Sequence, residues 1–119
     1  MAKTVFIVDD NKRICELLDD FLRGENYAVL CANGGSEALD ILGSRQVDVA
    51  VIDLLLAGDV SGDRVIERTI AAGIPVITMS GALASDHRGR DLTRPHLRKP
   101  FKMRELQYAI DAFLKDRHS

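Results

Sequence analysis

The chain has 119 residues, of which 46% are hydrophobic and 29% are charged, a composition that predicts one globular domain over residues 1–119 with a core of its own. No apolar run is long enough to span a bilayer, and the start at Met1 lacks the segments of an export signal, so we expect a cytosolic protein without a membrane partner. The formal net charge of −2 conceals an asymmetry, because residues 1–60 carry 5 basic and 11 acidic side chains and residues 61–119 carry 11 basic and 7 acidic ones.

Short apolar runs rich in Val and Ile alternate along the chain with segments whose apolar residues recur every three or four positions, the patterns of buried strands and amphipathic helices. Strands are expected over residues 4–8, 27–32, 47–56, 74–79 and 96–99. Helices are expected around residues 14–24, 36–42, 65–73 and 106–114. Residues 82–95 have little apolar periodicity, so we predict only a short or irregular helix there. The alternation predicts an α/β fold, a doubly wound parallel sheet of five strands with helices on both faces.

Side chains that can bind ligands or react lie where four of these strands end: Asp9 and Asp10, Asp53, Ser80, and Lys99. The carboxyl ends of parallel strands share one edge of the sheet, so these side chains are expected to converge. Three clustered carboxylates need a cation, and their hard oxygen donors suit Mg²⁺ or Mn²⁺. With an ammonium and a hydroxyl nearby, the cluster predicts a site for a phosphoryl group, with a carboxylate as the nucleophile.

At these residues the chain resembles the receiver domain of response regulators in two-component signalling. The resemblance covers almost the whole length, and its motifs are the segments Val5–Asp10, Gly34–Leu39, Val49–Leu54, Val76–Gly81 and Lys99–Phe101. Each motif alone is weak, but five in the right order are specific. The resemblance implies a flavodoxin-like (βα)₅ fold, a three-layer sandwich.

The resemblance also implies roles in the site. Asp53 is expected to accept a phosphoryl group from a histidine kinase or a histidine phosphotransfer protein in a Mg²⁺-dependent reaction. Asp10 is expected to bind the metal directly, Asp9 to act mainly through water, and the backbone carbonyl of Leu55 to be a further ligand.

Two further residues take roles from the same resemblance. Lys99 is expected to pair with the phosphoryl oxygens, and the Lys99–Pro100 peptide bond is expected to be cis. Ser80 matches the hydroxyl that moves toward the phosphoryl group when the domain switches.

The chain departs from the family pattern near the site. Ala57 replaces a usual proline, in a loop that is one residue longer than usual. Leu55 and Ala82 stand where many relatives have polar side chains that orient the attacking water, so we predict slow hydrolysis of the acyl phosphate. His96 stands where the family has a Tyr or Phe that changes rotamer on switching; it is either a pH-sensitive reporter or a half-exposed ring that fills an aromatic slot.

A basic segment, residues 81–104, contains two acidic residues and seven basic ones: Arg88, Arg90, Arg94, Arg98, Lys99, Lys102 and Arg104. In the family this region forms the output and dimer face, so we expect it to bind a downstream protein target, with a homodimer as an alternative. No aromatic residues interleave with the arginines to stack bases, so we do not expect nucleic-acid binding.

The preferred hypothesis is a signalling switch that is not an enzyme beyond its own phosphorylation and slow dephosphorylation. A degenerate receiver that acts as a phosphorylation-independent scaffold is the first alternative, because the loop after Asp53 is altered. An aspartyl-phosphate phosphatase is the second, but three leucines follow Asp53 where such an enzyme needs a general acid.

Overall fold

The computed structural model describes residues 2–81 and 94–114 of the chain. Strands and helices alternate along this part of the chain until the last two strands, between which residues 82–93 lie. In chain order the elements are β1 (Thr4–Val8), α1 (Lys12–Gly24), β2 (Ala28–Ala32), α2 (Gly35–Ser44), β3 (Val49–Asp53), α3 (Gly62–Ala71), β4 (Val76–Ser80), β5 (His96–Arg98) and α4 (Met103–Leu114). Of the predicted helix over residues 82–95, only the last two residues belong to the described part.

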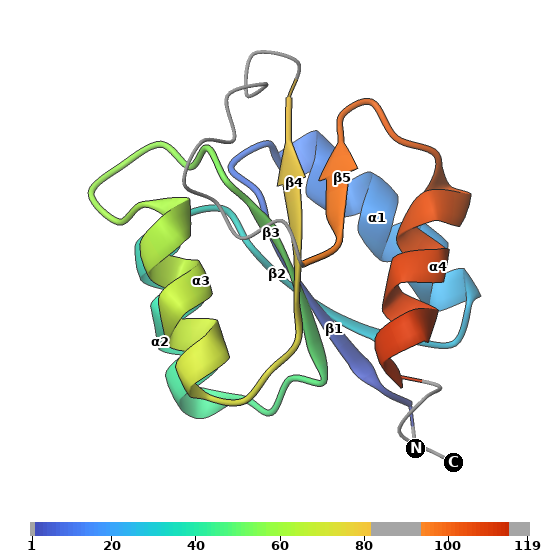
Figure 1. Ribbon diagram of the computed structural model, residues 1–119, viewed down its shortest axis with the longest axis horizontal. Helices are drawn as coiled ribbons and strands as arrows, with labels where there is room; N and C mark the ends of the chain where they lie inside the picture. The colour runs from blue at the N-terminus through green and yellow to red at the C-terminus, as the bar shows by residue number, and fades with distance from the viewer. Residues whose placement is uncertain (1, 82–93, 115–119) are drawn as a thin grey trace.

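The five strands form one parallel sheet in the order β2-β1-β3-β4-β5. Helices α1 and α4 cover one face of this sheet, and α2 and α3 cover the other (Figure 1). The predicted three-layer α/β sandwich is therefore confirmed. Since all strands run the same way, the loops that follow β1, β3, β4 and β5 lie along one edge.

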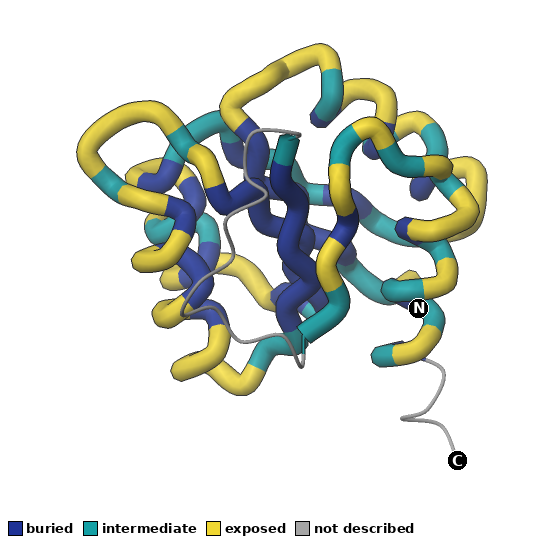
Figure 2. The backbone as a smooth tube through the Cα atoms, turned by 45° about the horizontal axis from the view of Figure 1, so that its top comes forward, coloured by how far each residue is buried: buried dark blue, intermediate teal, exposed yellow. Residues whose placement is uncertain are grey.

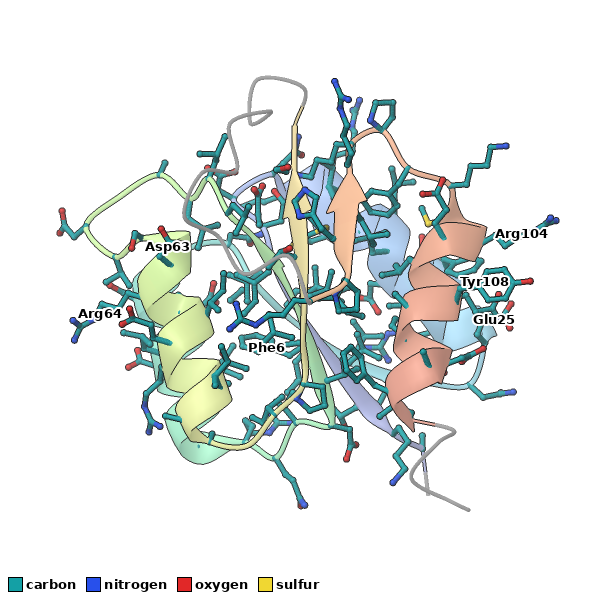
Figure 3. All side chains as sticks on the ribbon, viewed as in Figure 1. Phe6, Glu25, Asp63, Arg64, Arg104 and Tyr108 are labelled. Atoms are coloured by element: carbon teal, nitrogen blue, oxygen red, sulfur yellow. The ribbon has the colours of Figure 1, made fainter. Side chains whose placement is uncertain are left out.

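The three central strands, β1, β3 and β4, are buried on both faces, and they form the dark centre of the molecule in Figure 2. Successive side chains point to opposite faces, so the core has two halves. Phe6 of β1 points toward the layer of α3 (Figure 3), whereas its neighbours Val5 and Ile7 pack with the residues of α1 and α4.

Polar caps fix where two of the helices begin. The side chain of Asn11 accepts hydrogen bonds from the backbone N–H groups of Arg13 and Ile14, and Ser61 does the same for Arg64. These bonds satisfy donors that have no partner inside the helix. Each cap follows a strand-end loop, so each helix starts next to the carboxyl edge of the sheet.

The third strand is shorter than the apolar run of residues 47–56 predicts, because it ends at Asp53. One oxygen of the Asp53 carboxylate accepts the backbone N–H of Leu55 at 2.9 Å, a local turn that diverts the chain from the sheet. Leu55 consequently lies in the following loop with an exposed side chain.

The peptide bond between Lys99 and Pro100 is cis, as the resemblance implies. Within the described ranges, 2–81 and 94–114, no helix has the length and apolar character needed to cross a membrane.

Candidate functional site

Three carboxylates meet at the carboxyl edge of the sheet. Asp9 and Asp10 directly follow β1, and Asp53 is the last residue of the adjacent strand β3. One carboxylate oxygen from each lies within 4.8 Å of the others. Asp9 is completely buried, Asp53 is nearly so, and Asp10 is exposed. The cluster therefore faces solvent on one side, where a ligand can enter.

Lys99 bridges two of these carboxylates. Its ammonium lies 2.5 Å from Oδ2 of Asp9 and 2.9 Å from Oδ2 of Asp53. The backbone N–H of Lys99 also donates to the carbonyl of Ser80 at 2.7 Å, which holds the end of β5 against the end of β4. Lys99 thus belongs to the acidic pocket, where its charge is paired with two carboxylates and its side chain is 19% exposed.

Burial and charge act in opposite directions inside the pocket. Burial raises the pKa of Asp9, and the hydrogen bonds from Lys99 and from the backbone of Asn11 offset this only in part. For Lys99, burial disfavours the ammonium, but the hydrogen bonds and negative charges of Asp53 and Asp9 outweigh it and raise the pKa. Lys99 therefore remains a protonated ammonium, whereas the cost of burying the negative charge of Asp9 is only partly compensated.

Backbone N–H groups orient all three carboxylates. Asn11 donates to Asp9 at 2.9 Å, Leu55 donates to Asp53 at 2.9 Å, and Ala57 donates to Asp10 at 3.1 Å. The last bond connects the loop after β3 with the loop after β1. Ala57, which departs from the family pattern by not being proline, uses the N–H that a proline lacks.

The donor set fits a hard divalent cation. Among residues 2–81 and 94–114, three carboxylates face one ammonium, so this part of the pocket has an excess of negative charge, and its donors are the oxygens that Mg²⁺ and Mn²⁺ prefer. Asp9, Asp10 and Asp53 would hold the ion. The structure places the N–H of Leu55 on Asp53, and the role of the Leu55 carbonyl as a ligand remains a prediction.

Ser80 is the buried last residue of β4, and its hydroxyl is directed to a histidine. Its Oγ lies 2.8 Å from Nε2 of His96, and Nδ1 of the same ring lies 2.7 Å from Oγ1 of Thr78. Ser80 therefore joins the pocket through its backbone bond to Lys99, while its side chain is held on β5. The interpretation of His96 as a ring that only fills an aromatic slot did not include these two hydrogen bonds.

Sequence reasoning missed Thr78. It lies two residues before Ser80 on the same strand, so the two hydroxyls share a face of the sheet, and it pairs in register with His96. The alternation of side chains along β4 could have shown that Thr78 and Ser80 share a face. The register that places the imidazole between the hydroxyls was not readable without the pairing of β4 and β5.

Asn33 was missed as well. This residue follows β2, and its side-chain amide donates to the carbonyl of Asp9 at 3.0 Å and to the sulfur of Cys15 at 3.3 Å. The thiol of Cys15 in turn donates to the same carbonyl at 3.5 Å. These contacts hold the Asp9 backbone from behind. The sequence signal that could have indicated this role is the position of Asn33, a polar residue directly after β2, the strand next to β1.

Comparison with known proteins identifies this arrangement. The family model of the response regulator receiver domain matches residues 5–111. The response regulator protein TrrA from Thermotoga maritima, solved in complex with Mg(2+)-BeF, is 28% identical with a TM-score of 0.81, over 94% of this chain and 99% of that one.

Two other solved structures have the same fold. A putative response regulator from Chloroflexus aurantiacus is 28% identical with a TM-score of 0.80, over 97% of this chain and 99% of that one. A CheY-like receiver domain protein from Methanospirillum hungatei has a TM-score of 0.85 at 23% identity, over 99% of this chain and 98% of that one. Together with the family match over most of its length, the acidic pocket and the five-stranded sheet show that this chain belongs to the response regulator receiver domain family.

Proposed function

We propose that this receiver domain is a phosphorylation switch in which Asp53 accepts a phosphoryl group from a histidine kinase or a histidine phosphotransfer protein. The observation that carries the proposal is the convergence of three carboxylates and Lys99 at one edge of the sheet. A scaffold that never binds a phosphoryl group has no need for an exposed carboxylate beside two buried ones.

In the proposed reaction a carboxylate oxygen of Asp53 attacks the phosphorus atom, and the bond from phosphorus to the imidazole nitrogen of the donor breaks. The products are an acyl phosphate on Asp53 and a free histidine on the donor. The N–H of Leu55 and the ammonium of Lys99 hold the Asp53 carboxylate in place before the attack. Lys99 then has a phosphoryl oxygen as a new partner.

A bound Mg²⁺ or Mn²⁺ supplies positive charge to the carboxylates and to the phosphoryl oxygens. The residues proposed to hold it are Asp9, Asp10 and Asp53, with the carbonyl of Leu55 as a further ligand. The other residues supply position: Lys99 neutralises charge, and Ser80 supplies a hydroxyl that can donate to the phosphoryl group.

The proposed output is a change in protein binding at β5, α4 and the basic segment. Arg98, Lys102 and Arg104 are exposed there, and Figure 3 shows Arg104 and Tyr108 projecting outward from α4. Tyr108 is 72% exposed. An aromatic side chain among cations suits a partner with an acidic surface, and a second copy of this chain is the alternative partner.

The test is the intact mass after incubation with acetyl phosphate and Mg²⁺, beside an Asp53→Asn control and a reaction with chelator. The expected result is one added phosphoryl group on the wild type and none in either control. We propose that the protein changes its own phosphorylation state and is not an enzyme for another substrate.

The same experiment distinguishes the alternatives. Continuous release of phosphate from acetyl phosphate, at many turnovers a minute, supports a phosphatase instead. An unmodified wild type that also fails to respond to beryllofluoride supports the phosphorylation-independent scaffold.

A further inference from the structure

The imidazole of His96 holds two hydroxyls of the neighbouring strand at the same time. Thr78 and Ser80 alternate onto one face of β4, and His96 is paired in register with Thr78. The ring places Nδ1 2.7 Å from the Thr78 hydroxyl and Nε2 2.8 Å from the Ser80 hydroxyl. Thr78 is 7% exposed and Ser80 1% exposed, so the hydroxyl ends of these bonds are shielded from water, whereas His96 is itself exposed.

The contacts indicate where the protons lie on the Thr78 hydroxyl, the His96 imidazole and the Ser80 hydroxyl. A neutral imidazole has one N–H donor and one acceptor nitrogen. The Thr78 hydroxyl also lies 3.5 Å from the carbonyl of Pro95, which can only accept. If Thr78 gives its proton to Pro95, it accepts from Nδ1–H of His96. Nε2 is then the acceptor, and the hydroxyl of Ser80 donates to it. This is the arrangement of a neutral ring that satisfies all three contacts.

Ser80 has one hydroxyl proton, and two acceptors compete for it: Nε2 of His96 and a phosphoryl oxygen. In the tautomer assigned above, the acceptor in the resting protein is Nε2 of His96, 2.8 Å from the Ser80 hydroxyl. In the phosphorylated protein, the role proposed above for Ser80 requires the same proton to point at a phosphoryl oxygen. Both bonds use one donor, so they cannot form together while the imidazole is neutral.

We propose that His96 is a positioning residue that holds the Ser80 hydroxyl away from the phosphoryl site, so that imidazole and phosphoryl group compete for one hydroxyl proton. The inference rests on the proposed function of Asp53. When Ser80 turns to the phosphoryl group it keeps its proton, and the Nε2 acceptor of His96 loses its donor. The state of the imidazole then reports the state of Asp53.

The backbone allows this movement to stay local. The carbonyl of Ser80 accepts the N–H of Lys99 at 2.7 Å, so the end of β4 remains fixed while the side chain rotates. Lys99 follows three residues after His96 and contacts Asp53. A single short segment therefore carries the group that holds Ser80 and the cation that meets the phosphoryl oxygens.

The direct test is nitrogen NMR of the histidine side chains at about pH 8.5, roughly two units above the ordinary histidine pKa. A His96→Phe spectrum assigns the ring among the three histidines of the chain. In the free protein we expect a protonated Nδ1 and a hydrogen-bonded, unprotonated Nε2, the less common tautomer of free histidine. In Ser80→Ala, and in wild type with Mg²⁺ and beryllofluoride, the Nε2 resonance moves in the same direction. A protonated Nε2 in the free protein, or no movement with beryllofluoride, overturns the proposal.

Binding provides a second readout. His96→Phe keeps a ring of similar size but frees the Ser80 proton, so beryllofluoride should bind roughly two- to tenfold more tightly, the range of one hydrogen bond. His96→Gln retains an amide acceptor for Ser80 and should remain close to wild type. In a Ser80→Ala background, His96→Phe should have no further effect, which is the sign of a pair that acts together. Equal or weaker binding by His96→Phe, or an additive effect, contradicts the proposal.

These outcomes separate the inference from the proposed function. If beryllofluoride binds and Asp53 is phosphorylated while the His96 resonances stay fixed, the function stands and the competition is wrong. If beryllofluoride does not bind, the function fails and the competition fails with it, while the free-protein spectrum still decides the resting tautomer.

Discussion

Leu55 lies two residues after Asp53, the proposed phosphoacceptor. Its backbone N–H donates the hydrogen bond to the Asp53 carboxylate that is described above, while the residue is 55% exposed. An apolar side chain at this position excludes a hydrogen bond to an attacking water. The acyl phosphate of this chain should therefore hydrolyse slowly.

Leu55→Gln should shorten the phosphoryl lifetime, because its amide can orient a water toward phosphorus. The expected increase in the dephosphorylation rate is on the order of tenfold, less than a full general base supplies. The measurement is the decay of the phosphorylated mass after acetyl phosphate is removed. Leu55→Met is the matched apolar control and should decay like wild type. If Leu55→Gln decays no faster than the Met variant, the side chain at this position does not limit hydrolysis.

At the level of elements, the start of α3 lies against the end of β3, the strand of the proposed phosphoacceptor, without any side chain between them. A Cβ built on Gly62 lies 2.5 Å from the Asp53 carbonyl oxygen and 2.7 Å from that of Leu54. Both neighbours are backbone atoms at the end of β3, which cannot yield as a flexible side chain can. Glycine is therefore required here for close approach rather than for its φ angle.

Gly62→Ala should lower the free energy of unfolding by about 1–3 kcal/mol, the usual cost of overpacking, and slow phosphorylation of Asp53. Urea unfolding and the acetyl phosphate reaction measure the two effects. Gly43→Ala is the control in α2, where an added Cβ meets nothing within 4 Å. It should stabilise the protein by about 0.5–1 kcal/mol, since alanine is the better helix former. Equal stability changes in the two variants would contradict the packing argument.

A hydrogen bond also connects the start of β2 to the last helix. The hydroxyl of Tyr27 donates to Asp111 of α4 at 2.6 Å. Burial raises the pKa of Tyr27, and the hydrogen bond and charge of Asp111 raise it further. The folded state therefore favours the neutral phenol more than the unfolded state does. This stabilisation is complete below the ordinary tyrosine pKa of about 10 and is lost as the pH rises above it.

Tyr27→Phe should cost about 1 kcal/mol near pH 8, the usual contribution of a hydrogen bond. The difference between wild type and Tyr27→Phe should shrink above about pH 10, because only the wild type has a phenol at position 27 to ionise. Urea unfolding of both proteins at the two pH values measures this. A difference that grows with pH would show that the sign of the Tyr27 effect is wrong.

Across the whole molecule, sequence pattern was enough for the fold because the first four strands are separate apolar runs and each described helix has its own apolar face. The convergence of Asp9, Asp53 and Lys99 followed from the same pattern, since parallel strands end at one edge. Contacts that depend on register did not follow. The position of His96 between Thr78 and Ser80 arises from the alignment of β5 with β4, which is a property of two strands together.

The excess of negative charge in the pocket predicts that a divalent cation stabilises the whole domain. At ten times its dissociation constant Mg²⁺ should add about 1.4 kcal/mol to the free energy of unfolding, from mass action alone. Thermal unfolding with and without MgCl₂, at constant ionic strength, measures this. Asp10→Asn should reduce the effect strongly, whereas Asp40→Asn, on the exposed side of α2, should leave it unchanged. Equal stabilisation of both variants would place the ion elsewhere.

Strand β5 has three residues and lies at the edge of the sheet, with His96 at its start and Lys99 directly after its end. A protein that docks on β5 therefore touches the segment that carries both groups. Binding equilibria are reciprocal, so the factor by which phosphorylation changes the affinity for such a partner is the factor by which the partner changes the equilibrium of phosphorylation. A partner docked on β5 then shifts the equilibrium of phosphorylation as well as responding to it.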